Sequence, residues 1–248
     1  MSTTREFGRF FRHTVHELTH GRPIYWAWVG ALLVVVGIGF VAWLRQIDQG
    51  LITTNMRDPV SWGFYIGNFT FLVGVAAAAV LLVIPAYVYH WKPLKEVVIL
   101  GELLAISSIV MCGLFVMVDV GRPAAVWHLL PIVGTPHLPQ SLLAWDMIVL
   151  NGYLVLNLVI VTYMLFCLFR GRQPKAKIFV PLVLFSIPAA VGIHTVTAFL
   201  YNGMAARPFW NASILAPRFI ASALCSGPAV LLVLCLLYTS DAADERTW

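Results

Sequence analysis

A small set of polar side chains interrupts an otherwise apolar sequence, and their types suit proton exchange and hydrogen bonding. The set combines three carboxyl groups with a tyrosine, an asparagine and a histidine. Hydroxyl, amide and imidazole groups can donate hydrogen bonds to a carbonyl oxygen, and a carboxyl group can accept or deliver a proton. The chemistry indicated is therefore hydrogen bonding coupled to proton transfer. The residues are Tyr65, Asn68, Glu102, Asp119, Asp146 and His194.

The sequence around these residues is too apolar for a soluble protein. It is 60% hydrophobic and 11% charged, with a mean hydropathy of +0.85, whereas soluble domains carry roughly 25% charged residues. Hydrocarbon tolerates helices but penalises charge, so ionisable residues kept there mark a functional site by default. We therefore predict an integral membrane protein of the all-α class.

Six apolar stretches reach the length of about 20 residues that a helix needs to cross a bilayer. Small residues recur in the second stretch, which lets neighbouring helices approach closely, so we expect that helix to be central. The sequence predicts a polytopic transmembrane helix bundle with spans at 25–44, 62–89, 97–118, 142–169, 178–200 and 214–238.

Positive charges are distributed unevenly between the two sets of loops. Ten Lys or Arg residues fall in segment 1–24 and in loops 90–95 and 170–177, and five fall on the opposite side. Loops rich in Lys and Arg stay in the cytoplasm. We therefore predict a cytoplasmic N-terminus, and the pI of about 9.2 needs no nucleic acid to explain it.

Counting residues along the spans places most of the polar residues at one depth. Four spans each contribute a polar side chain within about two turns of their outer ends, given a rise of about 1.5 Å per residue. One such residue would mean little, but five at one level predict a shared polar pocket in the outer half. These five are Tyr65, Asn68, Asp119, Asp146 and His194, with Arg122 just beyond Asp119.

Glu102 is the exception, because it lies in the inner half of the third span. It is about 25 Å from Asp119 along the helix axis. Two interpretations stay open: a carboxyl group bonded to nearby backbone or kept protonated, and the inner end of a proton path.

The chain is expected to have three parts. Segment 1–24 is a basic cytoplasmic arm that could form an amphipathic helix on the inner leaflet; His13, His16 and His20 share one face of it, as a solvated face or as a metal or partner site. Residues 25–237 form the transmembrane domain. Residues 238–248 are abruptly polar and resemble a translated adapter tail at the end of a truncated gene.

Several kinds of site have no support in the sequence. The four cysteines fall inside predicted spans and form no CxxC pair, so zinc or iron–sulfur ligation is not expected. No phosphate-binding glycine loop, nucleophile elbow or nucleic-acid motif occurs. We expect no metal site, no catalytic residue and no nucleic-acid partner.

Four blocks of sequence resemble the NrfD/PsrC family of quinone-interacting membrane subunits, and within it the DsrP-type subunits of sulfur-metabolising bacteria. Full-length members look longer, with about ten spans, so the chain is expected to be an N-terminal fragment. The blocks are DPVSWGFYIGNFTFLVGVAAAAVLL (58–82), VDVGRPAAVWHLL (118–130), SLLAWDMIVLNGYLVLN (141–157) and ARPFWNASILAPRFIASALCSG (206–227).

The resemblance implies a subunit of the bacterial cytoplasmic (inner) membrane that binds menaquinone or ubiquinone and has no haem or iron–sulfur cluster of its own. It would pass electrons between the quinone and a four-cluster ferredoxin-type iron–sulfur subunit on the periplasmic face, in a respiratory complex whose catalytic or cytochrome subunit lies elsewhere. Tyr65, Asn68 and His194 would donate to the quinone carbonyls. Asp119 or Asp146 would exchange protons.

Three further points stay open at this stage. Arg122 could hold Asp119 charged or bind lipid phosphate, and Trp62, Trp127 and Trp145 could flank a quinone ring or form the interfacial aromatic belt. The chain could instead be a haem b cytochrome subunit, although only His194 lies well inside a span. A membrane transporter is the second alternative, although transporters favour internal repeats and broken midplane helices.

Overall fold

The computed structural model describes residues 3–57, 59–60, 62–77, 80, 82, 86, 89, 91–129 and 133–244. The chain divides into two compact units. One unit comprises Met1–Ser61 with Tyr163–Gln173, and the other comprises Trp62–Thr162 with Pro174–Trp248. Each unit is described by itself.

Five helices are long and apolar enough to cross a membrane: Pro23–Gln49, Val97–Asp119, Leu142–Phe169, Ala176–Asn202 and Leu215–Leu237. They confirm the first and the third to sixth predicted spans and the all-α class. The second predicted span, 62–89, overlaps the shorter apolar helix α3 (Phe64–Ala76), and much of its remainder lies outside the described residues. The chain is thus a multi-pass integral membrane protein.

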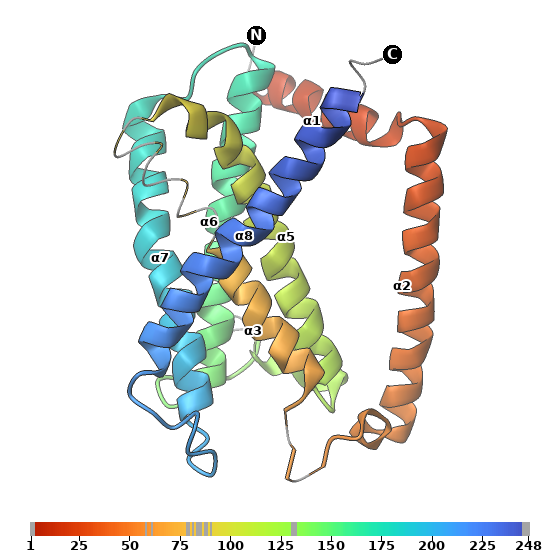
Figure 1. Cartoon of the computed structure of the whole chain (residues 1–248), viewed down its shortest axis with the longest axis vertical. Helices are drawn as coiled ribbons and strands as arrows, with labels where there is room; N and C mark the ends of the chain where they lie inside the picture. Colours follow the sequence, from red (N-terminus) through yellow and green to blue (C-terminus); the bar gives the residue numbers. More distant parts are fainter. Residues whose placement is uncertain are drawn as a thin grey trace. The chain divides into compact units, whose positions relative to one another are not determined.

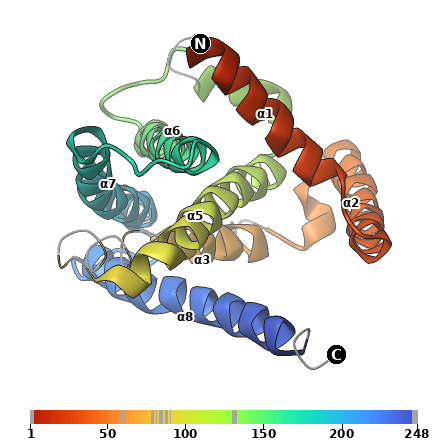
Figure 2. The ribbon, with the colours of Figure 1, turned by 90° about the horizontal axis from the view of Figure 1, so that it is seen from above.

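In the larger unit, α3 packs against α5 (Lys92–Asp119), α7 (Ala176–Asn202) and α8 (Leu215–Asp244). Figure 2 shows α3 between α5 and α8. A Cβ atom added at Gly74 would come within 2.9 Å of Ser226 Oγ and 3.6 Å of Ala223 Cα on α8. The small residue therefore permits the close approach that the sequence predicts for this helix.

Helix α6 (Leu142–Phe169) completes the core of the larger unit through the face that carries Leu150 and Tyr153. Those side chains are buried together with Phe69 and Val73 of α3 and Ile193 of α7. Among the described residues, a short 3-10 helix, η3 (Pro123–Leu129), follows α5. The core of this unit therefore joins residues of α3, α5, α6, α7 and α8.

The smaller unit contains α1 (Thr3–Thr19), α2 (Pro23–Gln49), the 3-10 turn η1 (Leu51–Thr54) and the last residues of α6. Pro23 begins α2, where its missing N–H costs nothing, and Gly50 ends it at φ +84°, a left-handed conformation that favours glycine. In Figures 1 and 2, α1 runs crosswise to α2. The last residue of the expected membrane domain, Leu237, lies within α8, which continues to Asp244; residues 245–248 of the expected tail lie outside the described residues.

Candidate functional site

A cavity of about 390 Å³ lies beside the N-terminal half of α3 in the larger unit. Its walls come from α3, the end of α7, and the connection into α8 together with the first turns of that helix. The volume falls within the range of roughly 300–1,000 Å³ that is typical of small-molecule sites. The lining includes Trp62, Thr70, Tyr201, Phe209, Trp210 and Arg218.

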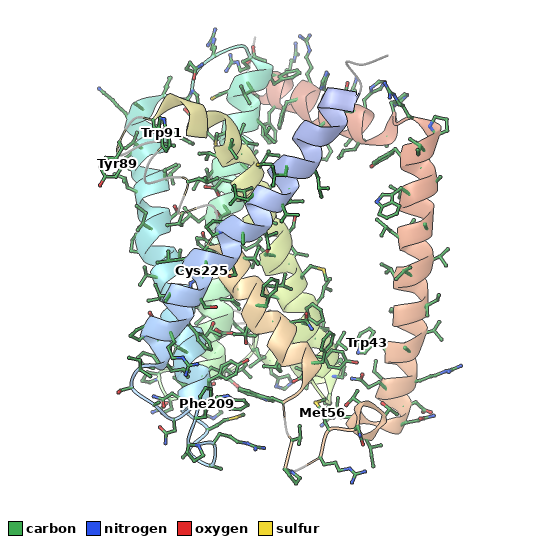
Figure 3. All side chains as sticks on the ribbon, in the orientation of Figure 1. Trp43, Met56, Tyr89, Trp91, Phe209 and Cys225 are labelled. Atoms are coloured by element: carbon green, nitrogen blue, oxygen red, sulfur yellow. The ribbon has the colours of Figure 1, made fainter. Side chains whose placement is uncertain are left out.

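Aromatic rings dominate the wall of this cavity. The ring of Tyr201 lies edge-on to Trp62 and Trp210, at centroid distances of 5.0 and 5.2 Å. The two indole rings stack at 5.9 Å with an interplanar angle of 30°. Phe209, on the connection between α7 and α8 (Figure 3), carries the Arg218 guanidinium 4.7 Å from its ring centroid. Such a wall suits a flat, conjugated ligand, because offset and edge-to-face ring contacts are favourable.

A pair of hydroxyl groups forms the polar part of the wall. The Tyr201 hydroxyl and Thr70 Oγ1 both lie within hydrogen-bonding distance of the Ile66 carbonyl oxygen, at 3.3 and 2.9 Å. The two hydroxyls are also hydrogen-bonded to each other. Each can rotate its proton, so either can donate to a ligand that enters the cavity.

A second cavity of about 210 Å³ adjoins the first and shares Gly67, Thr70, Phe219 and Ser222 with it. It is lined by His194 of α7, which is buried. His194 Nδ1 lies 2.6 Å from the Ala190 carbonyl oxygen, so this nitrogen carries the proton. Nε2 has no hydrogen bond of good geometry among the described residues. The backbone carbonyl of Val73 is close enough to the imidazole to interact with it electrostatically. His194 therefore places a buried imidazole at the wall of the second cavity.

Two carboxyl groups of the larger unit belong to the surroundings of the hydroxyl pair. Asp146 is buried on α6 and accepts a hydrogen bond from Thr197 Oγ1 at 2.6 Å. Asp119 ends α5, and its Oδ1 is buried without a partner in the described part of the chain. Both carboxyl groups lie within electrostatic range of Tyr201. Groups that can hold or exchange protons thus lie within electrostatic range of the cavity wall at Tyr201.

A separate buried polar cluster surrounds Glu102. Both carboxyl oxygens of Glu102 and Oδ1 of Asn157 are buried without a hydrogen-bond partner among the residues described. Tyr153 lies within electrostatic range of Glu102 and donates to the Ala76 carbonyl oxygen at 3.3 Å. Buried polar groups normally have a partner, which can be an internal water. This cluster therefore has the composition of a hydrated interior site.

The structure brings part of the predicted set together. His194 and Asp146 are buried, and Asp146 and Asp119 lie within electrostatic range of Tyr201. Tyr65 and Asn68 lie on α3 but line neither cavity, and the Asn68 amide donates to the Phe64 carbonyl at 2.8 Å. Arg122 is exposed and forms no ion pair with Asp119.

The residues that line the larger cavity were mostly missed by reasoning from depth and charge. Tyr201 follows His194 by seven residues, which places both on one face of a helix. That spacing could have identified Tyr201. Trp210 and Arg218 carry no such signal, because their positions depend on how the connection between α7 and α8 folds.

Among the described residues, no three His, Cys, Asp or Glu side chains are placed to hold a metal ion. The donors that are present are hydroxyl, imidazole, carboxyl and guanidinium groups beside aromatic rings. They can hold a flat molecule through its faces, donate hydrogen bonds to oxygens at its edge and exchange protons with it.

Residues 52–247 match the family model described as "Polysulphide reductase, NrfD". Over 89% of its length the chain is 32% identical to a putative dimethyl sulfoxide reductase membrane subunit of Halobacterium salinarum. It is 24% identical over 84% of its length to the "Hdr-like menaquinol oxidoreductase integral membrane subunit" of Archaeoglobus fulgidus.

A shorter match, over 40% of the chain at 24% identity, is to the "Menaquinone reductase, integral membrane subunit" of Nitratidesulfovibrio vulgaris. The matches cover 53%, 49% and 24% of these three relatives, respectively. The chain therefore spans about half the length of the first two.

Proposed function

This chain belongs to the polysulphide reductase NrfD family, and from that membership and the cavity we propose that it is the quinone-binding membrane subunit of an oxidoreductase complex. The observation that carries the proposal is the aromatic cavity with its Thr70–Tyr201 hydroxyl pair. Two of the relatives are named for menaquinol or menaquinone, which favours menaquinone over ubiquinone.

The proposed position of the quinone headgroup is between Trp62 and Trp210, with a carbonyl oxygen toward the Thr70–Tyr201 pair. The quinone supplies the two-electron chemistry when it is bound. Tyr201 donates to one of its oxygens, and Arg218 lies at the same cavity wall. His194 and Asp146 hold and exchange protons behind the wall. Asp119, Tyr65, Asn68 and Arg122 remain proposals for the outer end of this site.

The partners and the membrane are also proposals. The electron partner is a four-cluster ferredoxin-type iron–sulfur subunit on the periplasmic face, next to a catalytic or cytochrome subunit of a DsrP-type complex. The location is the bacterial inner membrane with the N-terminus in the cytoplasm. The uneven distribution of Lys and Arg between the loops supports this orientation, and the names of the relatives support assembly into a reductase or oxidoreductase.

Glu102 is proposed as the inner end of a proton path. The oxygens of Glu102 and Oδ1 of Asn157 have no hydrogen-bond partner among the described residues, and the Tyr153 hydroxyl is nearby. These groups support an internal water chain at this level. Asp146 lies seven residues from Tyr153 on α6, about 10 Å along the helix and on a similar face. The path would lead from the cavity wall through Asp146 toward Glu102.

The test is quinol oxidation by the complete complex in membranes, with Tyr201→Phe compared against Tyr65→Phe. Tyr201→Phe keeps the ring contacts but loses the hydroxyl donor, which is worth about 0.5–1.5 kcal/mol. We expect a rise of about 3- to 10-fold in the KM for quinol, with the partner iron–sulfur signals unchanged. Tyr25→Phe, on the exposed start of α2, is the matched control.

Two outcomes would contradict this placement. If Tyr65→Phe changed the kinetics and Tyr201→Phe did not, the headgroup would have to lie beside the outer polar residues and outside the cavity. Normal kinetics in both variants, combined with failure of an azido-quinone to label α3 or α8, would show that the quinone does not bind at this end of the bundle.

A further inference from the structure

We propose that α1 binds anionic phospholipid headgroups at the membrane–water interface. The proposal concerns the smaller unit and is independent of the proposed quinone site. It rests on the two faces of α1, on the way its aromatic residues are anchored, and on the position of both its ends.

The sequence of α1 divides cleanly into a cationic and an apolar face. Spacings of three and four place residues on one helical face. By this rule the cationic face collects Arg5, Arg9, Arg12 and His16, whereas the opposite face carries Phe7, Phe11, Val15 and Leu18. The side chains of Phe11 and Leu18 are 65% and 62% exposed. A helix with this division lies in the interface, with its apolar face toward the acyl chains.

Aromatic contacts fix α1 to the end of α6. The Phe10 ring lies 5.7 Å from the rings of both Phe166 and Phe169, and the Phe7 ring lies 5.8 Å from Phe166. The Arg170 guanidinium forms an ion pair with Glu6 at 2.7 Å. These contacts hold α1 against the last turn of an apolar spanning helix.

The other end of α1 is tied to the start of a second spanning helix. α1 ends at Thr19 and α2 begins at Pro23, so three residues separate them. Helices that span a membrane end at its surface, and α1 is attached to two such ends. Figure 2 shows α1 along its length and α2 end-on. α1 therefore lies at the level of the headgroups and along the membrane plane.

The cations of α1 are available to an external anion. Both carboxyl groups of the helix are engaged, since Glu6 pairs with Arg170 and Glu17 lies 3.8 Å from His13. Arg5, Arg9 and Arg12 are exposed, and no ion pair joins them to a described carboxylate. At headgroup level, lipid phosphate is the anion within reach, and Arg binds phosphate through paired hydrogen bonds. The exposed apolar side chains on the other face of α1 favour lipid over a soluble acidic partner.

The experiment measures amide hydrogen exchange of α1 in the full chain, assembled in its complex and reconstituted in nanodiscs. One set of discs contains phosphatidylcholine alone, and the other contains about one third phosphatidylglycerol. We expect slower exchange of α1 in the anionic discs. The Arg9→Gln/Arg12→Gln variant should lose most of that difference, because each arginine removed should weaken binding of α1 to the anionic surface about fivefold. Added salt should reduce it as well.

Arg45→Gln/Arg57→Gln removes two positive charges near the far end of α2 and should keep the difference. Phe11→Ser/Leu18→Ser should raise exchange of α1 in both kinds of disc. Unchanged protection of the spanning helices verifies folding of each variant. Equal exchange of wild-type α1 in the two discs would overturn the proposal, and so would a difference that survives Arg9→Gln/Arg12→Gln.

Discussion

At the scale of single residues, the hydrogen bond from Thr197 to Asp146 joins α7 to α6 inside the apolar core. Thr197→Val should remove the donor while nearly keeping the shape of the side chain. A buried carboxyl group left without its partner costs about 1–3 kcal/mol. We therefore expect a lower midpoint of thermal unfolding in detergent, with Thr197→Ser restoring most of the stability.

Thr195→Val is the matched control for this prediction. Thr195 lies on the same helix and is hydrogen-bonded to the Val191 carbonyl of its own preceding turn. Its replacement should change the midpoint little. Equal effects at the two positions would mean that the Thr197–Asp146 bond contributes no specific stability.

Glu102 gives the second prediction at this scale. Glu102→Gln keeps the size of the side chain but removes the exchangeable carboxyl proton. In the complete complex reconstituted in vesicles, we expect fewer protons translocated per electron while the quinone reaction continues. Glu17→Gln, on the exposed side of α1, controls for the loss of one carboxyl group. An unchanged proton-to-electron ratio in Glu102→Gln would remove this role.

At the scale of helices, α3 leaves the cavity open because Gly67 has no side chain. A Cβ atom at Gly67 would meet no other atom within 4 Å, and the residue lines both cavities. Gly67→Leu should therefore fill the site without a clash. We expect at least a tenfold rise in the KM for quinol, about 1.4 kcal/mol, with normal assembly of the complex.

Gly152→Leu provides the comparison for this cavity-filling change. Gly152 is exposed on α6, and a Cβ atom there also meets nothing within 4 Å. Both changes improve helix propensity by a similar amount, so they differ only in what the new side chain fills. Equal kinetics in the two variants would show that the cavity is not the quinone site.

The membrane-spanning helices could be predicted from the sequence, but the sequence did not show which helix packs against which. Five spans were correct because length and hydropathy decide which segments cross a bilayer. Asp146 and His194, which residue counting placed at one depth, are both buried in the core. It could not give the pairing of Thr70 with Tyr201, since 131 residues separate them and only helix packing brings them together. Tyr65, predicted from the same counting, is not part of the cavity lining.

At the scale of the whole molecule, orientation in the membrane is the prediction most easily tested. Gln173 and Asn211 are exposed residues in loops on opposite predicted sides. In intact cells, an impermeant maleimide should label Asn211→Cys but should label Gln173→Cys only after the membrane is permeabilised. The native cysteines alone provide the background. The reverse pattern would invert the predicted topology.

The stacked Trp62 and Trp210 also have an optical consequence. They are two of nine tryptophans in the chain, and their indole rings lie against each other at the cavity wall. Either indole fluoresces next to any molecule that fills the cavity, and a conjugated electron acceptor bound there would quench this fluorescence. The difference in emission between the wild type and Trp210→Phe would then isolate the cavity from the other tryptophans. The fluorescence of these two tryptophans would therefore report whether a ligand occupies the cavity.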